Sequence, residues 1–165
     1  LLIPSTLTAD VSTKAENIAK QVVKALNSAG VFAVELFLNK DGSIWVNETA
    51  CRVHNSGHST IEAALSSQFD QMLRTLMKLP LGSTKLLTTS AMVNLIGAEN
   101  EIGDAKIENI DQMLNLPGTY LHWYAKSETR PGRKMGHITI LNDDLDELKK
   151  NIDFVNKTIK VVAKK

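Results

Sequence analysis

The sequence predicts an α+β chain built from two consecutive parts. In the first half, apolar residues at helical spacing flank two adjacent strand-like segments, whereas short strand-like and helical segments mix after residue 85. Pro80 and Gly82 end the first pattern. We therefore expect a hairpin with flanking helices over residues 1–83 and a small mixed α/β domain over residues 84–165.

The first half is predicted to fold as helix, hairpin and helix. Residues 8–27 and 60–78 place apolar side chains along one helical face, and residues 31–38 are typical of a mostly buried strand. Residues 39–42 form a turn in which Gly42 allows a positive φ, so that residues 43–49 return as the antiparallel partner strand.

The second half shows shorter elements. Strands are predicted at residues 91–96, 119–125 and 137–141, and a short helix at 107–114. Residues 143–156 begin with acidic and end with basic side chains, as a helix dipole favours. We expect the lysines from Lys149 onward to form a solvated face.

Composition and charge limit the classes of function. The 165 residues carry 19 cations against 18 anions, so a nucleic-acid partner is not expected, and no apolar run reaches the roughly 18 residues that span a membrane. Cys51 is the only cysteine, which excludes an internal disulfide and suits a reducing, cytoplasmic location. Residues 1–6 contain no initiator Met and no signal-peptide pattern, so we expect the chain to derive from a longer one.

Two carboxylates in the hairpin are candidate metal ligands. Glu35 interrupts an apolar strand, and a buried carboxylate requires a cation beside it. Glu48 follows Asn47 near the end of the partner strand, and two carboxylates with an amide suit Mg²⁺. Alternatively, Glu35 pairs with a basic side chain and Glu48 lies at a solvated strand end.

The loop after the hairpin is a candidate anion site. Arg52, His54 and Asn55 bring a guanidinium, an imidazole and an amide into one short segment, and Gly57 allows close approach of a ligand. Alternatively, a serine of this loop caps the next helix and the histidines are surface residues. The segment lacks the ligand spacings of common zinc sites.

A second basic loop lies between the strands predicted at 119–125 and 137–141. Lys126 and Arg133 are its candidate phosphate ligands, because Lys and Arg bind phosphate through charge-assisted hydrogen bonds. The alternative is a solvated basic turn.

Several segments together resemble the N5-carboxyaminoimidazole ribonucleotide synthetase family of ATP-grasp enzymes. The loops 54–58 (HNSGH) and 133–137 (RKMGH) are the most specific of them. In order and spacing, the matching segments are residues 34–37, 47–58, 60–63, 67–69, 79–84 and 133–137. The resemblance covers almost the whole chain, as the C-terminal portion of such an enzyme.

The resemblance implies an ATP- and Mg²⁺-dependent ligase of purine biosynthesis that carboxylates aminoimidazole ribonucleotide with bicarbonate, through carboxyphosphate. It implies that Glu35 and Glu48 hold Mg²⁺ against ATP with Asn47 alongside. The remaining implied roles are contact with bicarbonate or carboxyphosphate by Arg52, His54 and Asn55, and binding of the ribonucleotide phosphate by Lys126 and Arg133.

The chain also departs from the family pattern. The family usually has prolines where Cys51 and Val53 stand and a glycine where Ala125 stands. The lobe that grips adenine is absent, so we expect the isolated chain to be inactive. Two alternatives stay open: an oligomerising, non-catalytic module, since cut sheets leave open strand edges, and another ATP-grasp ligase such as the formate-dependent glycinamide ribonucleotide transformylase. We also expect a homo-oligomer.

Overall fold

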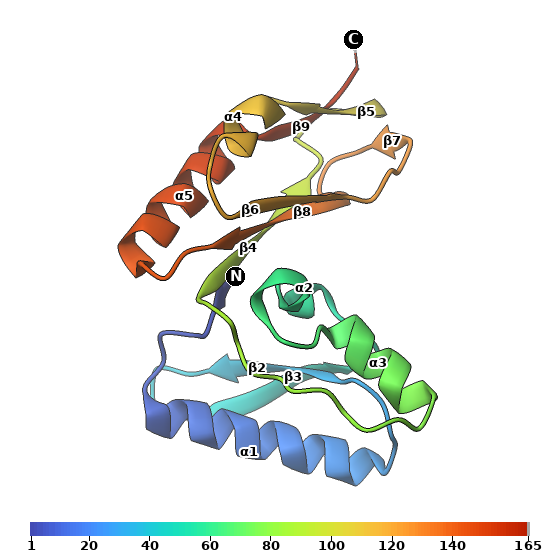
Figure 1. Cartoon of the computed structure of the whole chain (residues 1–165), viewed down its shortest axis with the longest axis vertical. Coiled ribbons are helices and arrows are strands. Elements are labelled where there is room, and N and C mark those ends of the chain that lie inside the picture. The colour runs from blue at the N-terminus through green and yellow to red at the C-terminus, as the bar shows by residue number, and fades with distance from the viewer. Residues whose placement is uncertain (165) are drawn as a thin grey trace. The chain divides into compact units, whose positions relative to one another are not determined.

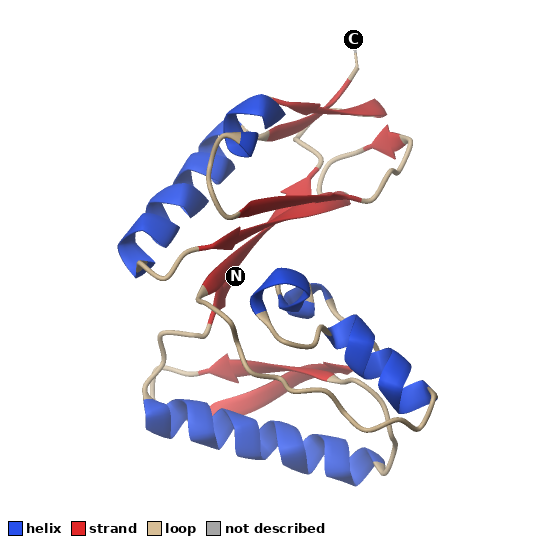
Figure 2. Ribbon diagram, viewed as in Figure 1, coloured by secondary structure: helices blue, strands red, loops and turns tan. Residues whose placement is uncertain are grey.

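The computed structural model describes residues 1–164, and these residues form two compact units (Figure 1). We call Ser5–Leu86 the hairpin unit, and Leu1–Pro4 together with the chain from Leu87 onward the sheet unit. The short strand β1 (Leu2–Ile3) belongs to the sheet unit because it pairs with a strand there. Helices and antiparallel sheets occupy separate segments, which confirms the predicted α+β class (Figure 2).

The hairpin unit begins with a helix and a two-stranded sheet, as predicted. Helix α1 (Ala9–Leu26) ends at Asn27, which takes the left-handed conformation that stops a helix. Strands β2 (Ala33–Leu38) and β3 (Ile44–Ala50) pair antiparallel. A bulge between Glu35 and Leu36 shifts the register near the middle of the hairpin.

The single helix predicted over residues 60–78 is wrong. The chain instead forms a 3₁₀ turn η1 (Asn55–Gly57), a short helix α2 (Thr60–Ala63) and the helix α3 (Gln68–Leu76). Ala64 turns to an extended conformation and pairs with Leu86, while the Ser67 hydroxyl accepts the N–H of Asp70 and starts α3 anew. Capping and strand pairing therefore override the continuous apolar periodicity.

The sheet unit is built around a four-stranded antiparallel sheet in the order β1-β4-β8-β6. The three predicted strands are confirmed as β4 (Ser90–Ile96), β6 (Thr119–Trp123) and β8 (Lys134–Leu141), although β8 starts three residues earlier than expected. Strand β8 lies in the middle of the sheet, and its residues from Met135 to Ile140 are buried. The second half of the basic loop thus leads directly into a core strand.

A second sheet holds β7 (Glu128–Thr129), β5 (Gly103–Glu108) and β9 (Lys160–Ala163). The helix predicted at 107–114 is correct only for α4 (Ile110–Leu114), because Asn109 takes a left-handed conformation that separates strand from helix. The expectation of a solvated lysine face is confirmed for the described lysines from Lys149 to Lys164, which are all exposed, while Lys165 lies outside the described residues. Strand β9 itself was not predicted, and its Val161 is buried. Alternation along a strand allows Val161 to be buried while the preceding Lys160 stays exposed.

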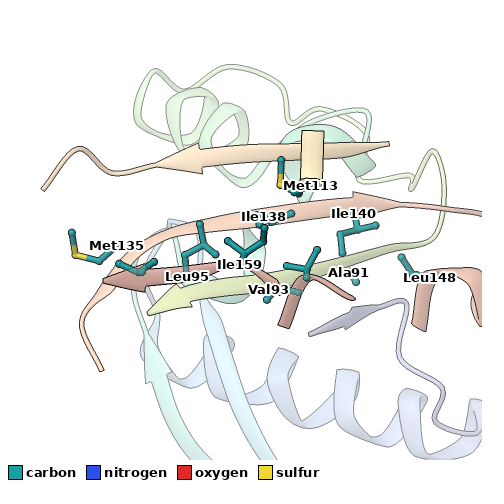
Figure 3. Packing of buried hydrophobic residues seen from close by; sticks show 11 residues of the cluster. Ala91, Val93, Leu95, Met113, Met135, Ile138, Ile140, Leu148 and Ile159 are labelled. Carbon is teal, nitrogen blue, oxygen red and sulfur yellow. The ribbon is translucent and has the colours of Figure 1, made fainter. Parts of the chain in front are cut away.

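The core of the sheet unit lies between the four-stranded sheet and helix α5 (Leu145–Thr158). Figure 3 shows the cluster, in which Leu148 of α5 and Ile138 and Ile140 of β8 are fully buried. The Asp144 carboxylate starts α5 by accepting the N–H groups of Asp146 and Glu147. Within residues 1–164, no helix is long and apolar enough to cross a membrane.

Candidate functional site

The hairpin unit gathers two carboxylates and an imidazole at one point. Glu35 of β2 lies directly opposite Glu48 of β3, and the His54 ring follows from the next loop. One ligand atom from each of these three side chains lies within 4.8 Å of the others. Asn47 joins them, because its Nδ2 donates to Glu35 Oε2 at 3.2 Å. The predicted metal ligands therefore converge.

The expected burial of Glu35 is wrong, because 45% of its side chain is exposed. The neighbouring Phe37 and Leu38 of β2 are exposed as well, since the sheet has only two strands within residues 1–164. Burial therefore gives no reason for a cation beside Glu35. The reason for a cation here is instead the repulsion between Glu35 and Glu48, because like charges directly opposite each other across two strands destabilise a hairpin.

The donor set fits Mg²⁺. Hard divalent cations prefer carboxylate and amide oxygens, and Glu35, Glu48 and Asn47 offer these from adjacent strand positions. The amide of Asn47 donates through its nitrogen, which leaves its oxygen available. A cation between the two carboxylates would also remove their mutual repulsion.

The hydrogen bonds of His54 define its tautomer. The backbone N–H of Ser56 can only donate, and it lies 3.3 Å from His54 Nδ1, so Nδ1 is the acceptor. The Ser56 hydroxyl lies 2.9 Å from the same nitrogen. In the neutral ring the hydrogen is therefore on Nε2, which is 3.7 Å from Glu35 Oε1.

Arg52 and His54 share a cavity of about 240 Å³ with Glu35. The cavity is smaller than most sites for drug-sized ligands and suits a small anion. Arg52 donates from Nη1 to the carbonyl of Val53, which leaves most of its five donors for another acceptor. Asn55 begins the 3₁₀ turn, and its carbonyl accepts from His58 N–H. The structure does not place Asn55 among the residues that line this cavity.

The sheet unit holds the predicted phosphate ligands in the loop before β8. Lys126 Nζ donates to the carbonyl of Lys134 at 2.6 Å, and Arg133 Nη1 donates to the carbonyl of Glu128 at 2.8 Å. Each cation thus braces its own loop with one donor and keeps further donors for an anion. Lys126 also lies 5.7 Å from the centre of the Tyr124 ring, within range of a cation–π contact.

Two backbone features shape this basic loop. Ala125 has φ 53°, a left-handed conformation that costs an L residue roughly 1 kcal/mol and that a glycine would adopt without this cost. Gly136 lets β8 approach β6, because an added Cβ would lie 2.5 Å from the carbonyl oxygen of His122. Burial raises the pKa of the Tyr124 hydroxyl, which lies 2.9 Å from His137 Nδ1.

Sequence reasoning missed one polar residue of the hairpin unit. Gln68 is 8% exposed, and its side-chain amide forms hydrogen bonds with both the N–H and the carbonyl of His54. The available signals were indirect: a serine cap immediately before it, and Gly57 in the facing loop. An amide at the first position of a helix is usually solvated, so its burial could not be predicted without the break between α2 and α3.

Comparison with known proteins gives two family matches and many similar chains. The ATP-grasp domain matches residues 1–69, and the phosphoribosylaminoimidazole carboxylase C-terminal domain matches residues 90–151. The chain is 40% identical over 147 residues to the N5-carboxyaminoimidazole ribonucleotide synthase of Aquifex aeolicus, an alignment covering 89% of this chain and 39% of the relative.

Solved structures agree with this similarity. The N5-carboxyaminoimidazole ribonucleotide synthetase of Thermotoga maritima superposes with a TM-score of 0.93 at 45% identity, over 99% of this chain and 45% of that one. The N5-carboxyaminoimidazole synthase of Aspergillus clavatus, solved with ADP and 5-aminoimidazole ribonucleotide, gives 0.83 at 37% identity, over 94% and 42%. The chain thus spans about two fifths of the length of the relatives it matches.

Proposed function

The chain belongs to the N5-carboxyaminoimidazole ribonucleotide synthetase family, and from this we propose that it supplies part of an ATP-grasp ligase that carboxylates aminoimidazole ribonucleotide with ATP and bicarbonate. The observation that supports this best is the convergence of Glu35, Glu48 and His54 within 4.8 Å. These residues lie on the hairpin and loop that match the family, and their chemistry suits phosphoryl transfer.

In this proposal the hairpin serves the nucleotide end of the reaction. Glu35 and Glu48 hold Mg²⁺, with the amide oxygen of Asn47 beside them. When bound, the cation neutralises charge on the phosphate oxygens of ATP. The protein's own contribution is to hold two carboxylates in register across β2 and β3, which keeps the ligand geometry fixed without a mobile loop.

The loop after the hairpin serves the carboxylate end. The guanidinium of Arg52 binds bicarbonate or carboxyphosphate, because it can donate two parallel charge-assisted hydrogen bonds to a pair of oxygens of the anion. His54 presents Nε2 on the same side as Glu35, and Asn55 follows it in the chain. A small cavity bordered by Arg52, His54 and Glu35 supports this assignment, because bicarbonate is itself a small anion.

Lys126 and Arg133 of the sheet unit bind the phosphate of aminoimidazole ribonucleotide in this proposal. Both side chains brace the loop through backbone carbonyls, and this bracing holds the cations in place before the substrate arrives. The phosphate then accepts from the donors that remain. Lys126 and Arg133 are therefore substrate-binding residues, distinct from the carboxylates that bind the metal.

We further propose that this chain alone lacks turnover and that it associates with other chains in the cytoplasm. The chain spans about two fifths of its relatives, and in this proposal the rest of the nucleotide site comes from residues outside this chain. Phe37 is 55% and Trp45 is 64% exposed on the two-stranded sheet, which favours a partner on that sheet. The free, exposed Cys51 supports a reducing compartment.

A chimera tests the proposed function. This chain replaces the corresponding segment of the Thermotoga maritima synthetase, which it matches over 99% of its length. We expect phosphate release from ATP that depends on both bicarbonate and aminoimidazole ribonucleotide, and loss of that release in the Glu48→Gln chimera. Equal release by the Glu48→Gln chimera would contradict the assignment, as would a folded chimera without substrate-dependent release.

A further inference from the structure

A buried amide holds the loop that carries His54. Gln68 opens helix α3, and its side chain is enclosed by the loop 54–60. The Oε1 atom accepts the N–H of His54 at 2.7 Å, and Nε2 donates to the His54 carbonyl at 2.8 Å. A neighbouring β-strand would make the same two hydrogen bonds, to the N–H and the carbonyl of an extended residue. Here the Gln68 side chain makes them instead, because His54 pairs with no strand of residues 1–164.

The remaining donor of Gln68 ties down the far end of the same loop. Its Nε2 also lies 3.1 Å from His58 Nδ1, and the His58 ring stacks on Phe69 of α3. The backbone N–H of Gln68 donates to Thr60 Oγ1, which in turn donates to the Gly57 carbonyl. The loop therefore contacts Gln68 before and after the 3₁₀ turn.

We infer that Gln68 is a positioning residue of the proposed ligase: it fixes the backbone of His54, and so aims the His54 ring at Glu35 and into the cavity beside Arg52. The catalytic consequence of this role rests on the proposed function. Its structural part stands on the hydrogen bonds and on the shared cavity, whose lining includes both Gln68 and His54.

His54 is held at two points. Its Nδ1 is held by Ser56 and its backbone by Gln68, so the ring cannot rotate away from Glu35 without breaking one of these contacts. Without the amide of Gln68, the N–H of His54 must find water or shift, and its carbonyl keeps only the N–H of Gly57, at 3.0 Å. A shift of about 1 Å in a reacting group can cost up to about a hundredfold in rate.

The same helix provides a matched control. Gln71 lies one turn further along α3, and it clamps the backbone of Gly82 in the same way, donating to the carbonyl at 2.8 Å and accepting the N–H at 3.1 Å. Gln71→Met thus removes the same kind of contact from the same helix without touching the loop 54–60. A general loss of stability would affect both variants, whereas a positioning role affects only Gln68→Met.

The first measurement uses this chain and needs no activity. Amide hydrogen exchange and ¹⁵N spectra of the histidine rings are recorded for the wild type, Gln68→Met and Gln71→Met. We expect exchange at the His54 amide to rise about tenfold in Gln68→Met, together with a changed Nδ1 shift of His54, and neither change in Gln71→Met. Unchanged exchange and ring shifts in Gln68→Met would overturn the inference.

The second measurement uses the chimera with the Thermotoga maritima synthetase. In Gln68→Met we expect kcat/KM for bicarbonate to fall by about tenfold to a hundredfold while the KM of aminoimidazole ribonucleotide stays within about twofold. Gln71→Met is expected to keep both values. Equal losses in the two variants would overturn a specific role of Gln68. An inactive wild-type chimera would instead contradict the proposed function, and the exchange measurement would then decide the structural part alone.

Discussion

Gly57→Ala is expected to destabilise the hairpin unit through one steric contact. An added Cβ would lie 2.5 Å from Oε1 and 2.7 Å from Cδ of Gln68, well inside ordinary contact. The amide must move by roughly 1 Å to reach normal separation, which breaks its paired bonds to His54. Two such bonds are worth about 1 kcal/mol each, so we expect a loss of about 2 kcal/mol in the free energy of unfolding.

Urea unfolding measures this loss, and Trp123→Phe makes the signal specific. Trp45 then remains as the only tryptophan and reports on the hairpin unit alone. The decisive control is the Gln68→Ser background, in which the shorter side chain leaves room for a Cβ at position 57. There the Gly57→Ala change should cost less than about 0.5 kcal/mol, giving a coupling energy of more than about 1 kcal/mol. Equal losses in both backgrounds would refute the steric argument.

Three further predictions concern other parts of the chain. Ala125→Gly should stabilise the sheet unit by about 0.5–1 kcal/mol in urea unfolding, because glycine has no Cβ to clash with the backbone at φ 53°. A destabilised variant would contradict this. Hydrogen bonds from the N–H groups of Glu147 and Asp146 lower the pKa of Asp144, so its carboxylate stabilises the fold above its unfolded pKa and loses this effect as pH falls through the lower folded pKa. The melting temperature of Asp144→Ala should therefore fall below that of the wild type near about pH 7 and approach it below about pH 4, whereas a constant gap would rule out the carboxylate charge as the cause. Trp45→Lys should weaken self-association in sedimentation velocity, whereas a wild-type monomer at all concentrations would exclude association through this sheet.

The regular elements could be predicted where local signals act alone. Helix α1 and the hairpin follow from apolar spacing and a short turn with Gly42. The break between α2 and α3 could not be predicted, because it depends on Ala64 pairing with Leu86 across more than about twenty residues. Strand β9 was missed for the same reason, because it forms by pairing with β5, which is distant in the sequence.

The candidate site shows the same division. A hairpin that brings Glu35 and Glu48 close together could be predicted, but their direct pairing depends on the bulge between Glu35 and Leu36, which could not. The exposure of Glu35 could not be predicted either, because it depends on how few strands cover the hairpin. The role of Gln68 depends on a helix start that tertiary contacts create, and so it lies beyond periodicity and motif spacing.

The proposed function separates a metal site in the hairpin unit from a substrate-phosphate site in the sheet unit. Titration of aminoimidazole ribonucleotide and of ATP against the chimera tests this separation directly. Lys126→Ala and Arg133→Ala should each weaken ribonucleotide binding by about tenfold to a hundredfold and leave ATP binding within about twofold, because a charge-assisted phosphate contact is lost. Glu35→Gln and Glu48→Gln should impair Mg²⁺-dependent ATP binding and turnover and leave ribonucleotide binding intact. Normal ribonucleotide affinity in both basic-loop variants would contradict the division into two sites.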